Sequence, residues 1–266
     1  MASESSSQFA VVTGASSGIG LELARQFAQH GFDLLVCAEN QEIERAAGEL
    51  RSEGQQVDTL RVDLATYDGV EQLWSAIQRS GRQLDAIAIN AGVGSSGPFA
   101  ETDLDKELNL VQLNVTSVVH LAKRVVQDMQ PRNEGFILFT SSIAGEAPGP
   151  FEAVYSASKA FVQSFALALR NELKETNIHV TALQPGATDT PFFEKAEAMD
   201  TKVGTGPKMD PAVVARQGFE ALMKGKDHVV AAKLKEKVMV AAGKVIPEKA
   251  AAEQHRKQGE PGSAKR

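Results

Sequence analysis

A tyrosine and a lysine four residues apart, Tyr155 and Lys159, are the side chains of this sequence best placed for proton transfer. Residues four apart lie on the same face of a helix, so both would point to one site. Ser142 precedes the tyrosine by thirteen residues and ends the apolar run 135–142. The three side chains indicate a proton-transfer site. The alternative for the tyrosine and lysine alone is a polar pair on the surface of an amphipathic helix.

The lysine has a specific chemical use beside a phenol. A free phenol has a pKa of about 10, which is too high for a base at neutral pH. An ammonium group about 4 Å away, at an effective dielectric constant of about 20, would stabilise the phenolate by roughly 4 kcal/mol. That energy corresponds to about three pKa units, so we expect Lys159 to bring the pKa of Tyr155 close to neutrality, where acid–base catalysis is most effective.

A glycine-rich turn at 13–20 is the first of the elements that must position these side chains. The apolar run 9–12 precedes it, and a helical pattern of apolar residues follows from position 21. Its glycines allow the backbone to approach a pyrophosphate at the N-terminus of that helix. A tight loop without a ligand is the alternative for a glycine pattern alone, but the flanking strand and helix favour nucleotide binding.

Strands and helices alternate along most of the chain. Further apolar runs predict strands, with helical periodicity between them, at 32–38, 56–64, 84–89, 135–142, 179–184 and, as an edge strand, 228–232. The alternation predicts an α/β fold, with a single doubly wound, Rossmann-type parallel sheet and helices on both faces. Ligands of such sheets bind at the carboxyl ends of the strands, and Ser142 lies at one of those ends.

The chain divides into three predicted segments. Residues 1–8 form a polar, serine-rich lead that we expect to be disordered, and residues 9–232 form the Rossmann-fold domain. Within that domain, residues 187–209 break the pattern and predict a variable substrate loop, because long loops in compact domains usually carry function. Residues 233–266 predict a C-terminal amphipathic helix and a polar tail, and the apolar face of that helix consists of Leu234, Val238, Ala242 and Val245. This basic end is either solvated or a contact to a membrane or partner.

Composition excludes several other classes of protein. The 266 residues carry a net charge of -6, which gives no general reason to expect nucleic-acid binding. The one cysteine, Cys37, cannot form an intramolecular disulfide, and the N-terminus lacks the features of a signal peptide. No apolar stretch is long enough to span a bilayer. We therefore expect a soluble, cytoplasmic protein with neither a nucleic-acid nor a membrane partner.

Taken in order, the motifs resemble the classical short-chain dehydrogenases/reductases. The resemblance covers about residues 9 to 190, and these are its motifs: Thr13-Gly-Ala-Ser-Ser-Gly-Ile-Gly20, Asn90-Ala-Gly92, Asn114, Ser142, Tyr155-Ser-Ala-Ser-Lys159 and Pro185-Gly186. Beyond these residues the family diverges. The resemblance therefore says little about the C-terminal segment.

The resemblance implies a role for each matched residue. Tyr155 would be the general acid/base, Lys159 would bond the nicotinamide ribose, Ser142 would hold the substrate oxygen and Asn114 would anchor a water in a proton relay. Besides Tyr155 and Lys159, the residues expected to contact the cofactor are Gly14, Ser16, Ser17, Gly18, Ile19, Gly20, Glu39, Asp63, Leu64, Asn90, Ala91, Gly92, Pro185, Gly186, Thr188 and Thr190. No metal site is expected.

Glu39 bears on which cofactor is used. It follows the last glycine by about twenty residues, where an acidic side chain accepts hydrogen bonds from the adenosine ribose. The family's NADP users tend to carry Arg or Lys near position 16 or after the second strand, whereas this chain has Ser16, Ser17 and Glu39. We therefore predict that NAD(H) is preferred and that NADP(H) is possible. A solvated acid at a strand end is the alternative for Glu39.

The resemblance implies an NAD(P)-dependent oxidoreductase, an alcohol dehydrogenase or ketoreductase, that acts on a secondary alcohol or the matching ketone. Two other functions stay open, a catalytically idle nucleotide-binding sensor and a dehydratase or epimerase on the same scaffold. Within or beside the variable loop, Phe192, Phe193, Met199 and Met209 suggest either an apolar substrate body or packing that closes the loop. Helices like those with Asn114 and Tyr155 pair across subunits in the family, so a homodimer or homotetramer is expected.

Overall fold

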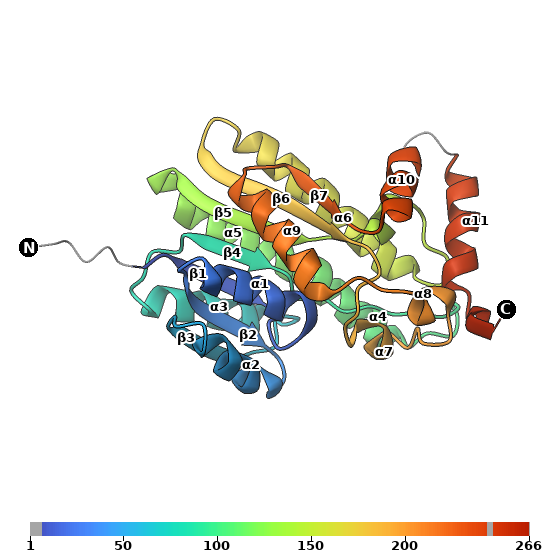
Figure 1. Ribbon diagram of the computed structural model, residues 1–266, viewed down its shortest axis with the longest axis horizontal. Helices are drawn as coiled ribbons and strands as arrows, with labels where there is room; N and C mark the ends of the chain where they lie inside the picture. The colour runs from blue at the N-terminus through green and yellow to red at the C-terminus, as the bar shows by residue number, and fades with distance from the viewer. Residues whose placement is uncertain (1–6, 244–246, 266) are drawn as a thin grey trace, which may run out of the picture.

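The computed structural model describes residues 7–243 and 247–265. Within them, one parallel sheet of seven strands has the order β3-β2-β1-β4-β5-β6-β7 (Figure 1). The strands are β1 (Phe9–Thr13), β2 (Asp33–Ala38), β3 (Val57–Arg61), β4 (Ala86–Ile89), β5 (Glu134–Thr140), β6 (Asn177–Pro185) and β7 (His228–Ala231). This confirms the predicted α/β class and the doubly wound, Rossmann-type sheet.

Helices cover both faces of the sheet. Helices α1 (Gly18–Gln29), α2 (Glu42–Arg51) and α9 (Pro211–Met223) pack on one face, and α3 (Tyr67–Arg79), α5 (Ser117–Met129) and α6 (Ala153–Glu172) on the other. Phe27, Leu50 and Phe219 belong to the first of the two resulting hydrophobic cores, and Leu73, Val125 and Val162 to the second. Every residue of β1, β2 and β4 is buried, which explains why their sequences are continuous apolar runs rather than alternating ones.

The strand order reverses between β1 and β4, since β2 lies on one side of β1 and β4 on the other. The crossover helices on either side of this point run on opposite faces, so a crevice opens beyond the carboxyl ends of the two strands. The glycine-rich turn follows β1 here, and Ser142 follows β5, the next strand beyond β4.

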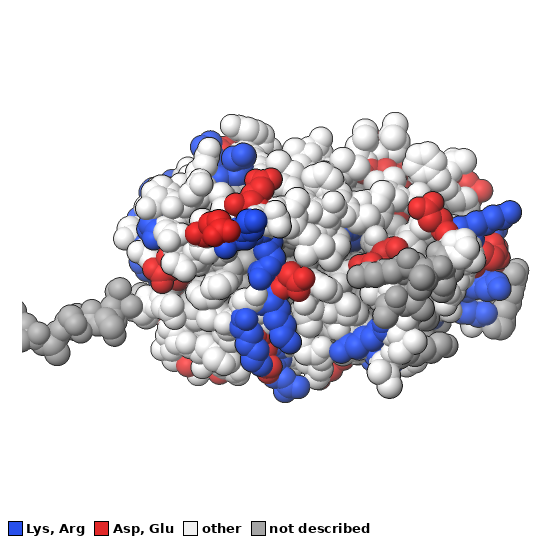
Figure 2. Space-filling model, turned by 90° about the horizontal axis from the view of Figure 1, so that it is seen from above, with Lys and Arg blue, Asp and Glu red and all other residues white. Residues whose placement is uncertain are grey.

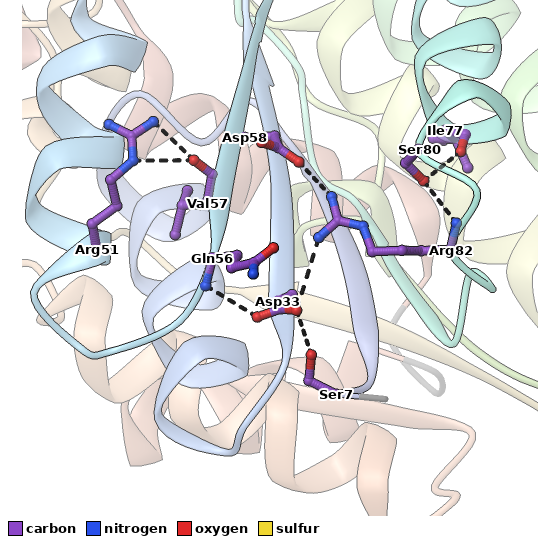
Figure 3. A network of polar contacts seen from close by, with 9 residues as sticks. All are labelled: Ser7, Asp33, Arg51, Gln56, Val57, Asp58, Ile77, Ser80 and Arg82. Atoms are coloured by element: carbon purple, nitrogen blue, oxygen red, sulfur yellow. Dashed lines mark hydrogen bonds and ion pairs between the residues drawn. The ribbon is translucent and has the colours of Figure 1, made fainter. Parts of the chain in front are cut away.

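A polar network around Asp33 lies at the amino ends of the strands, opposite the crevice (Figure 3). Its carboxylate accepts hydrogen bonds from the Gln56 backbone N–H at 3.0 Å and from the Ser7 hydroxyl, and it lies 3.9 Å from the Arg82 guanidinium. Arg82 also pairs with Asp58. These residues lie at or near the amino ends of the strands, so the network supports the sheet from the edge away from the crevice.

The variable segment 187–209 forms a long loop whose two ends lie side by side. Its two ends pair, because Met209 donates its backbone N–H to Ala187 at 2.8 Å and accepts one from Asp189 at 2.8 Å. Between these ends lie the short helices α7 (Phe192–Lys195) and α8 (Lys202–Thr205).

The C-terminal segment differs from the expected single helix and tail. It contains two helices, α10 (Leu234–Gly243) and α11 (Glu248–Gly259). Two residues of the expected apolar face are exposed, Leu234 by 78% and Val238 by 60%. The side chain of Ala242 and the whole of Val245 lie outside the described residues. Of the expected disordered lead, residues 1–6 also lie outside the described residues, while Ser7 contacts Asp33.

The helical stretch around Asn114 is irregular. Helix α4 (Leu104–Val111) leads through a π-helical turn, Gln112–Thr116, into α5. Such turns widen a helix locally and are frequent at functional sites. Here the turn contains Asn114.

Acidic and basic side chains lie beside one another on the face that Figure 2 shows, rather than in one continuous basic stripe. Among the described residues, no helix combines the length and the apolar character that crossing a membrane requires.

Candidate active site

A cavity of about 620 Å³ lies beyond the carboxyl ends of the strands. It is lined by the glycine turn, the ends of β2 to β6, the segment 187–209 and the C-terminal helix α11. Every residue expected to contact the cofactor lines this one cavity, and so do Ser142, Tyr155 and Lys159. The structure therefore brings the predicted cofactor residues and three of the four predicted catalytic residues together. Asn114 does not line the cavity.

The glycine turn is shaped for a close ligand. Gly14 and Gly18 have φ values of 68° and 58°, which disfavour any other residue. A Cβ at Gly18 would lie 2.8 Å from Cγ2 of Thr190, and one at Gly20 would meet the Gly14 carbonyl oxygen. Helix α1 begins after Ser17 with no side-chain cap and no acidic residue in its first turn, so its N–H groups are open to an anion.

Asn90 ties three strand ends together behind this turn. Its side-chain Nδ2 donates to the Thr13 carbonyl oxygen at 3.0 Å, and its Oδ1 accepts from the Thr140 hydroxyl at 3.0 Å. The backbone N–H groups of Asn90 and Ala91 both donate to the Thr13 hydroxyl. Asn90 lines the cavity as predicted, but its amide also fixes the geometry of β1, β4 and β5 there.

Ser142 and Tyr155 approach one another from different elements. Ser142 follows β5 and caps the short 3-10 helix Ile143–Glu146, where its Oγ accepts the Ala144 N–H at 3.1 Å. Tyr155 lies in the first turn of α6, and the Ser142 hydroxyl is near enough to the phenol to lower its pKa. Phe151, two residues before α6 begins, has a φ of 67°. This left-handed conformation costs about 1 kcal/mol or more for a residue with a Cβ.

Lys159 is buried, with 5% of its surface exposed. Its Nζ donates to the Thr140 carbonyl oxygen at 3.0 Å and lies 5.9 Å from the centre of the Tyr155 ring. Burial lowers the pKa of the Lys159 ammonium to about 8, because the charged form loses hydration. An ammonium has three N–H bonds, so two remain for other acceptors in the cavity.

The expected lowering of the Tyr155 pKa is wrong for this state of the site. The pKa of the Tyr155 phenol is raised above its ordinary value, chiefly by burial; the Ser142 hydrogen bond lowers it, and the Glu152 carboxylate raises it further. Burial dominates because the charged phenolate would lose its hydration, and the Lys159 ammonium is bonded to the Thr140 carbonyl oxygen. The phenol is therefore protonated at neutral pH and suited to donate a proton.

Asn114 lies behind the cavity wall and is 1% exposed. Its amide binds both backbone groups of Val93, accepting the N–H at 3.0 Å and donating to the carbonyl oxygen at 2.9 Å, and it also donates to the Ser158 hydroxyl at 3.1 Å. Its Oδ1 and Nζ of Lys159 both lie within 3.2 Å of the point where a Cβ on Gly92 would stand. Asn114 thus holds the Gly92–Val93 backbone. Its role in a water relay stays a prediction.

Aromatic residues close the cavity beside Tyr155. The ring of Phe192 lies 5.2 Å from that of Tyr155, and Phe193 packs edge-on against Phe192 at 5.6 Å. Both line the cavity. Of the two methionines expected with them, Met199 is 49% exposed and Met209 packs against the core, and neither lines the cavity.

Sequence reasoning missed three residues of this site. Glu152 lies one turn before Tyr155, and its charge acts on the phenol. Gln254 and His255 line the cavity from α11. The sequence of α11 is polar and has the pattern of a helix exposed to solvent, so it gave no signal for these two residues. The described residues contain no group of three or more His, Cys, Asp or Glu that could hold a metal ion.

A family model described as short chain dehydrogenase matches residues 8–201. The chain is 36% identical over 189 residues to a putative ketoacyl reductase of Streptomyces coelicolor, covering 70% of this chain and 72% of the relative. It is 32% identical over 231 residues to mouse dehydrogenase/reductase SDR family member 7B, and the match covers 83% of this chain and 72% of the relative. Among solved structures, a short-chain dehydrogenase from Sphingobium yanoikuyae in complex with NADPH is similar, with a TM-score of 0.79, 28% identity and 93% of each chain covered.

Proposed function

This chain belongs to the short-chain dehydrogenase/reductase family, and on that premise we propose that it transfers a hydride between a nicotinamide cofactor and a secondary alcohol or the matching ketone. The observation that carries the proposal is that Ser142, Tyr155 and Lys159 line the same cavity as the glycine turn. A proton donor and a nucleotide-binding turn in one cavity are the two parts that such a reaction needs.

The glycine turn and Lys159 are the groups proposed to hold the cofactor. The N–H groups at the start of α1 would bind the pyrophosphate, and the two remaining N–H bonds of Lys159 would bind ribose hydroxyls. When bound, the nicotinamide supplies or accepts the hydride. The crowded positions at Gly18 and Gly20 support this fit, because they leave space only for a backbone beside the ligand.

Proton transfer is assigned to Tyr155. In the direction of ketone reduction, its protonated phenol donates to the substrate oxygen while the Ser142 hydroxyl holds that oxygen. In the direction of alcohol oxidation the phenol must first lose its proton, which the raised pKa of Tyr155 opposes. Asn114 completes the proposed set by fixing the backbone at Gly92 and Val93.

NAD(H) is the proposed cofactor, with NADP(H) as the alternative. Two charged side chains, Glu39 and Asp63, line the end of the cavity near the ends of β2 and β3, and both are acidic. A 2'-phosphate placed there would be repelled. Because the Sphingobium relative was solved with NADPH, the ratio of catalytic efficiencies with the two cofactors is the test. A preference for NADPH above about tenfold would contradict the argument from Glu39.

We extend the proposal to a homodimer or homotetramer. Its support is the exposed apolar surface around α4, where Phe99 and Leu104 are each 67% exposed and Leu108 is 53% exposed. Exposed large apolar side chains that gather on one part of a surface often mark an interface. Light scattering at micromolar concentration tests it, and a monomer mass would contradict it. The cytoplasmic location stays a prediction for cell fractionation.

The first experiment combines cofactor binding with turnover. NADH and NADPH are titrated by fluorescence, and secondary alcohols and ketones are then assayed with the wild type, Tyr155→Phe and Tyr67→Phe. Tyr67 is the matched control, because it is the other of the two tyrosines in the sequence and is 68% exposed on α3. We expect turnover to disappear in Tyr155→Phe alone, with NADH affinity retained in both variants. Turnover that survives in Tyr155→Phe would contradict the proposed proton donor.

Transfer of deuterium from labelled NADH into product separates net reduction from dehydration or epimerisation. Tight NADH binding without turnover on any substrate would favour the idle sensor.

A further inference from the structure

The C-terminal helix α11 forms one wall of the cavity, and from it we propose a site for the substrate. We propose that Gln254 and His255 bind a neutral hydrogen-bonding group of the substrate, such as a hydroxyl, that is distinct from the reacting oxygen. The inference rests on the proposed function, and it narrows the substrate to a ketone or alcohol with a second polar group.

The face of α11 that meets the cavity is polar. Ala251, Gln254, His255 and Gln258 all line the cavity, and their spacing places them on one face of the helix. The segment 187–209 contributes Phe192, Phe193 and Val203 to the same cavity. The cavity thus has both apolar and polar walls, which is the arrangement that binds an apolar body and fixes its orientation through a few polar contacts.

His255 is held in place from two sides. Its Nε2 lies 3.6 Å from Oε2 of Glu152, and the two side chains are only 18% and 12% exposed. A Cβ on Gly149 would lie 3.1 Å from Cε1 of the ring, so the loop before α6 packs directly against it. The His255 ring is thus fixed by its neighbours while it lines the cavity, as a preorganised binding group requires.

Polar contacts also fix the two flanks of α11 to loops around the site. The Arg256 guanidinium lies 4.9 Å from the centre of the Phe151 ring, next to Glu152. After the helix, the Gly262 N–H donates to the Asp200 carboxylate at 2.9 Å, and the Ser263 hydroxyl accepts the Lys202 N–H at 3.0 Å. The helix therefore bridges the loop before the catalytic tyrosine and the variable segment, which sets the position of its polar face.

The chemistry of the wall points to a neutral group. A glutamine amide donates and accepts hydrogen bonds, and a hydroxyl can satisfy both. A carboxylate beside His255 would lie close to Glu152, and like charges repel. Lys195 and Lys202 also line the cavity, so a carboxylate is the competing chemistry that the experiment must distinguish.

The test measures binding as well as turnover. Three probes are used. The first is a medium-chain methyl ketone. The second carries a hydroxyl, and the third a carboxylate, at the end of the chain farthest from the carbonyl. Their dissociation constants are measured by calorimetry on NADH-loaded Tyr155→Phe protein, in which the proposed proton donor is absent. Gln254→Leu and His255→Leu are then added to that protein, with Glu253→Ala as the control, since Glu253 is exposed on α11 and does not line the cavity.

The hydroxyl ketone is expected to bind more tightly than the plain ketone, and each leucine variant should reduce that preference roughly three- to tenfold, the value of one neutral hydrogen bond. Affinity for the plain ketone and for NADH, and the result with Glu253→Ala, should not change. If His255→Leu fails to fold, Gln254→Leu alone decides the outcome.

Equal losses for both ketones, a preference for the carboxylate, or no ketone binding would overturn the inference. The two proposals fail differently. Absent turnover in wild-type protein with the hydroxyl preference intact would contradict the proposed function only, whereas normal turnover without that preference would contradict only the role of α11.

Discussion

The Nζ atom of Lys159 donates a hydrogen bond to the carbonyl oxygen of Thr140 at 3.0 Å, so the buried ammonium is anchored to the end of β5 rather than directed at the Tyr155 ring. This anchor places its two other N–H bonds at the cavity, next to Gly92. Two ammonium donors of Lys159 are thus free to face the cavity.

Cofactor affinity should therefore fall as pH rises through about 8, where Lys159 loses its proton. The lowered pKa means that the ammonium donors are present below that pH and are lost above it. We expect roughly a tenfold loss of NADH affinity between about pH 7 and pH 9.5, the scale of a charge-assisted hydrogen bond. Fluorescence titrations of wild type, Lys159→Met and the exposed control Lys123→Met check this. A pH dependence that persists in Lys159→Met would assign it to another group.

Removing the charge of Glu152 should shift the pH profile of alcohol oxidation to lower pH. The Glu152 carboxylate raises the pKa of Tyr155, so Glu152→Gln should lower that pKa and make the phenolate available earlier. The glutamine keeps the shape of the side chain beside His255. Rate profiles of the variant and of Glu253→Gln, a control on the outer face of α11, provide the measurement. Identical profiles would show that the phenol does not respond to this charge.

Asn114→Ala should destabilise the fold as well as the site. The Val93 N–H and C=O would lose their partner, and each orphaned group costs about 1–3 kcal/mol, so we expect a loss of roughly 2–4 kcal/mol in the free energy of unfolding. Denaturant unfolding measures it. A stability within about 0.5 kcal/mol of wild type, together with lost turnover, would instead favour a role confined to the proton relay.

Gly18→Ala tests the fit of the glycine turn to its neighbour. The left-handed φ of 58° should cost roughly 1–2 kcal/mol, and the new Cβ would also meet Cγ2 of Thr190 at 2.8 Å. Thr190→Ser removes that methyl, so the double variant should recover part of the NADH affinity that Gly18→Ala loses. Gly48→Ala is the control, because nothing lies within 4 Å of its Cβ position on the exposed side of α2. No recovery in the double variant would show that the Thr190 contact is unimportant.

Local spacing in the sequence was sufficient to identify the parts. Continuous apolar runs predicted the strands, since central parallel strands are buried on both faces, and the four-residue interval between Tyr155 and Lys159 placed both on one face of α6. The glycine positions could be interpreted in the same way, because the need for a positive φ is a property of each residue and its immediate neighbours.

Only the tertiary structure decided how those parts act on one another. The sign of the Tyr155 pKa shift depends on burial by the surrounding elements, and the hydrogen bonds of Asn114 depend on a backbone segment from another part of the chain. The same holds for His255, which α11 brings to Glu152 across most of the second half of the sequence. Desolvation and long-range contacts are set by the whole fold, whereas periodicity and turn chemistry are set by residues a few positions apart.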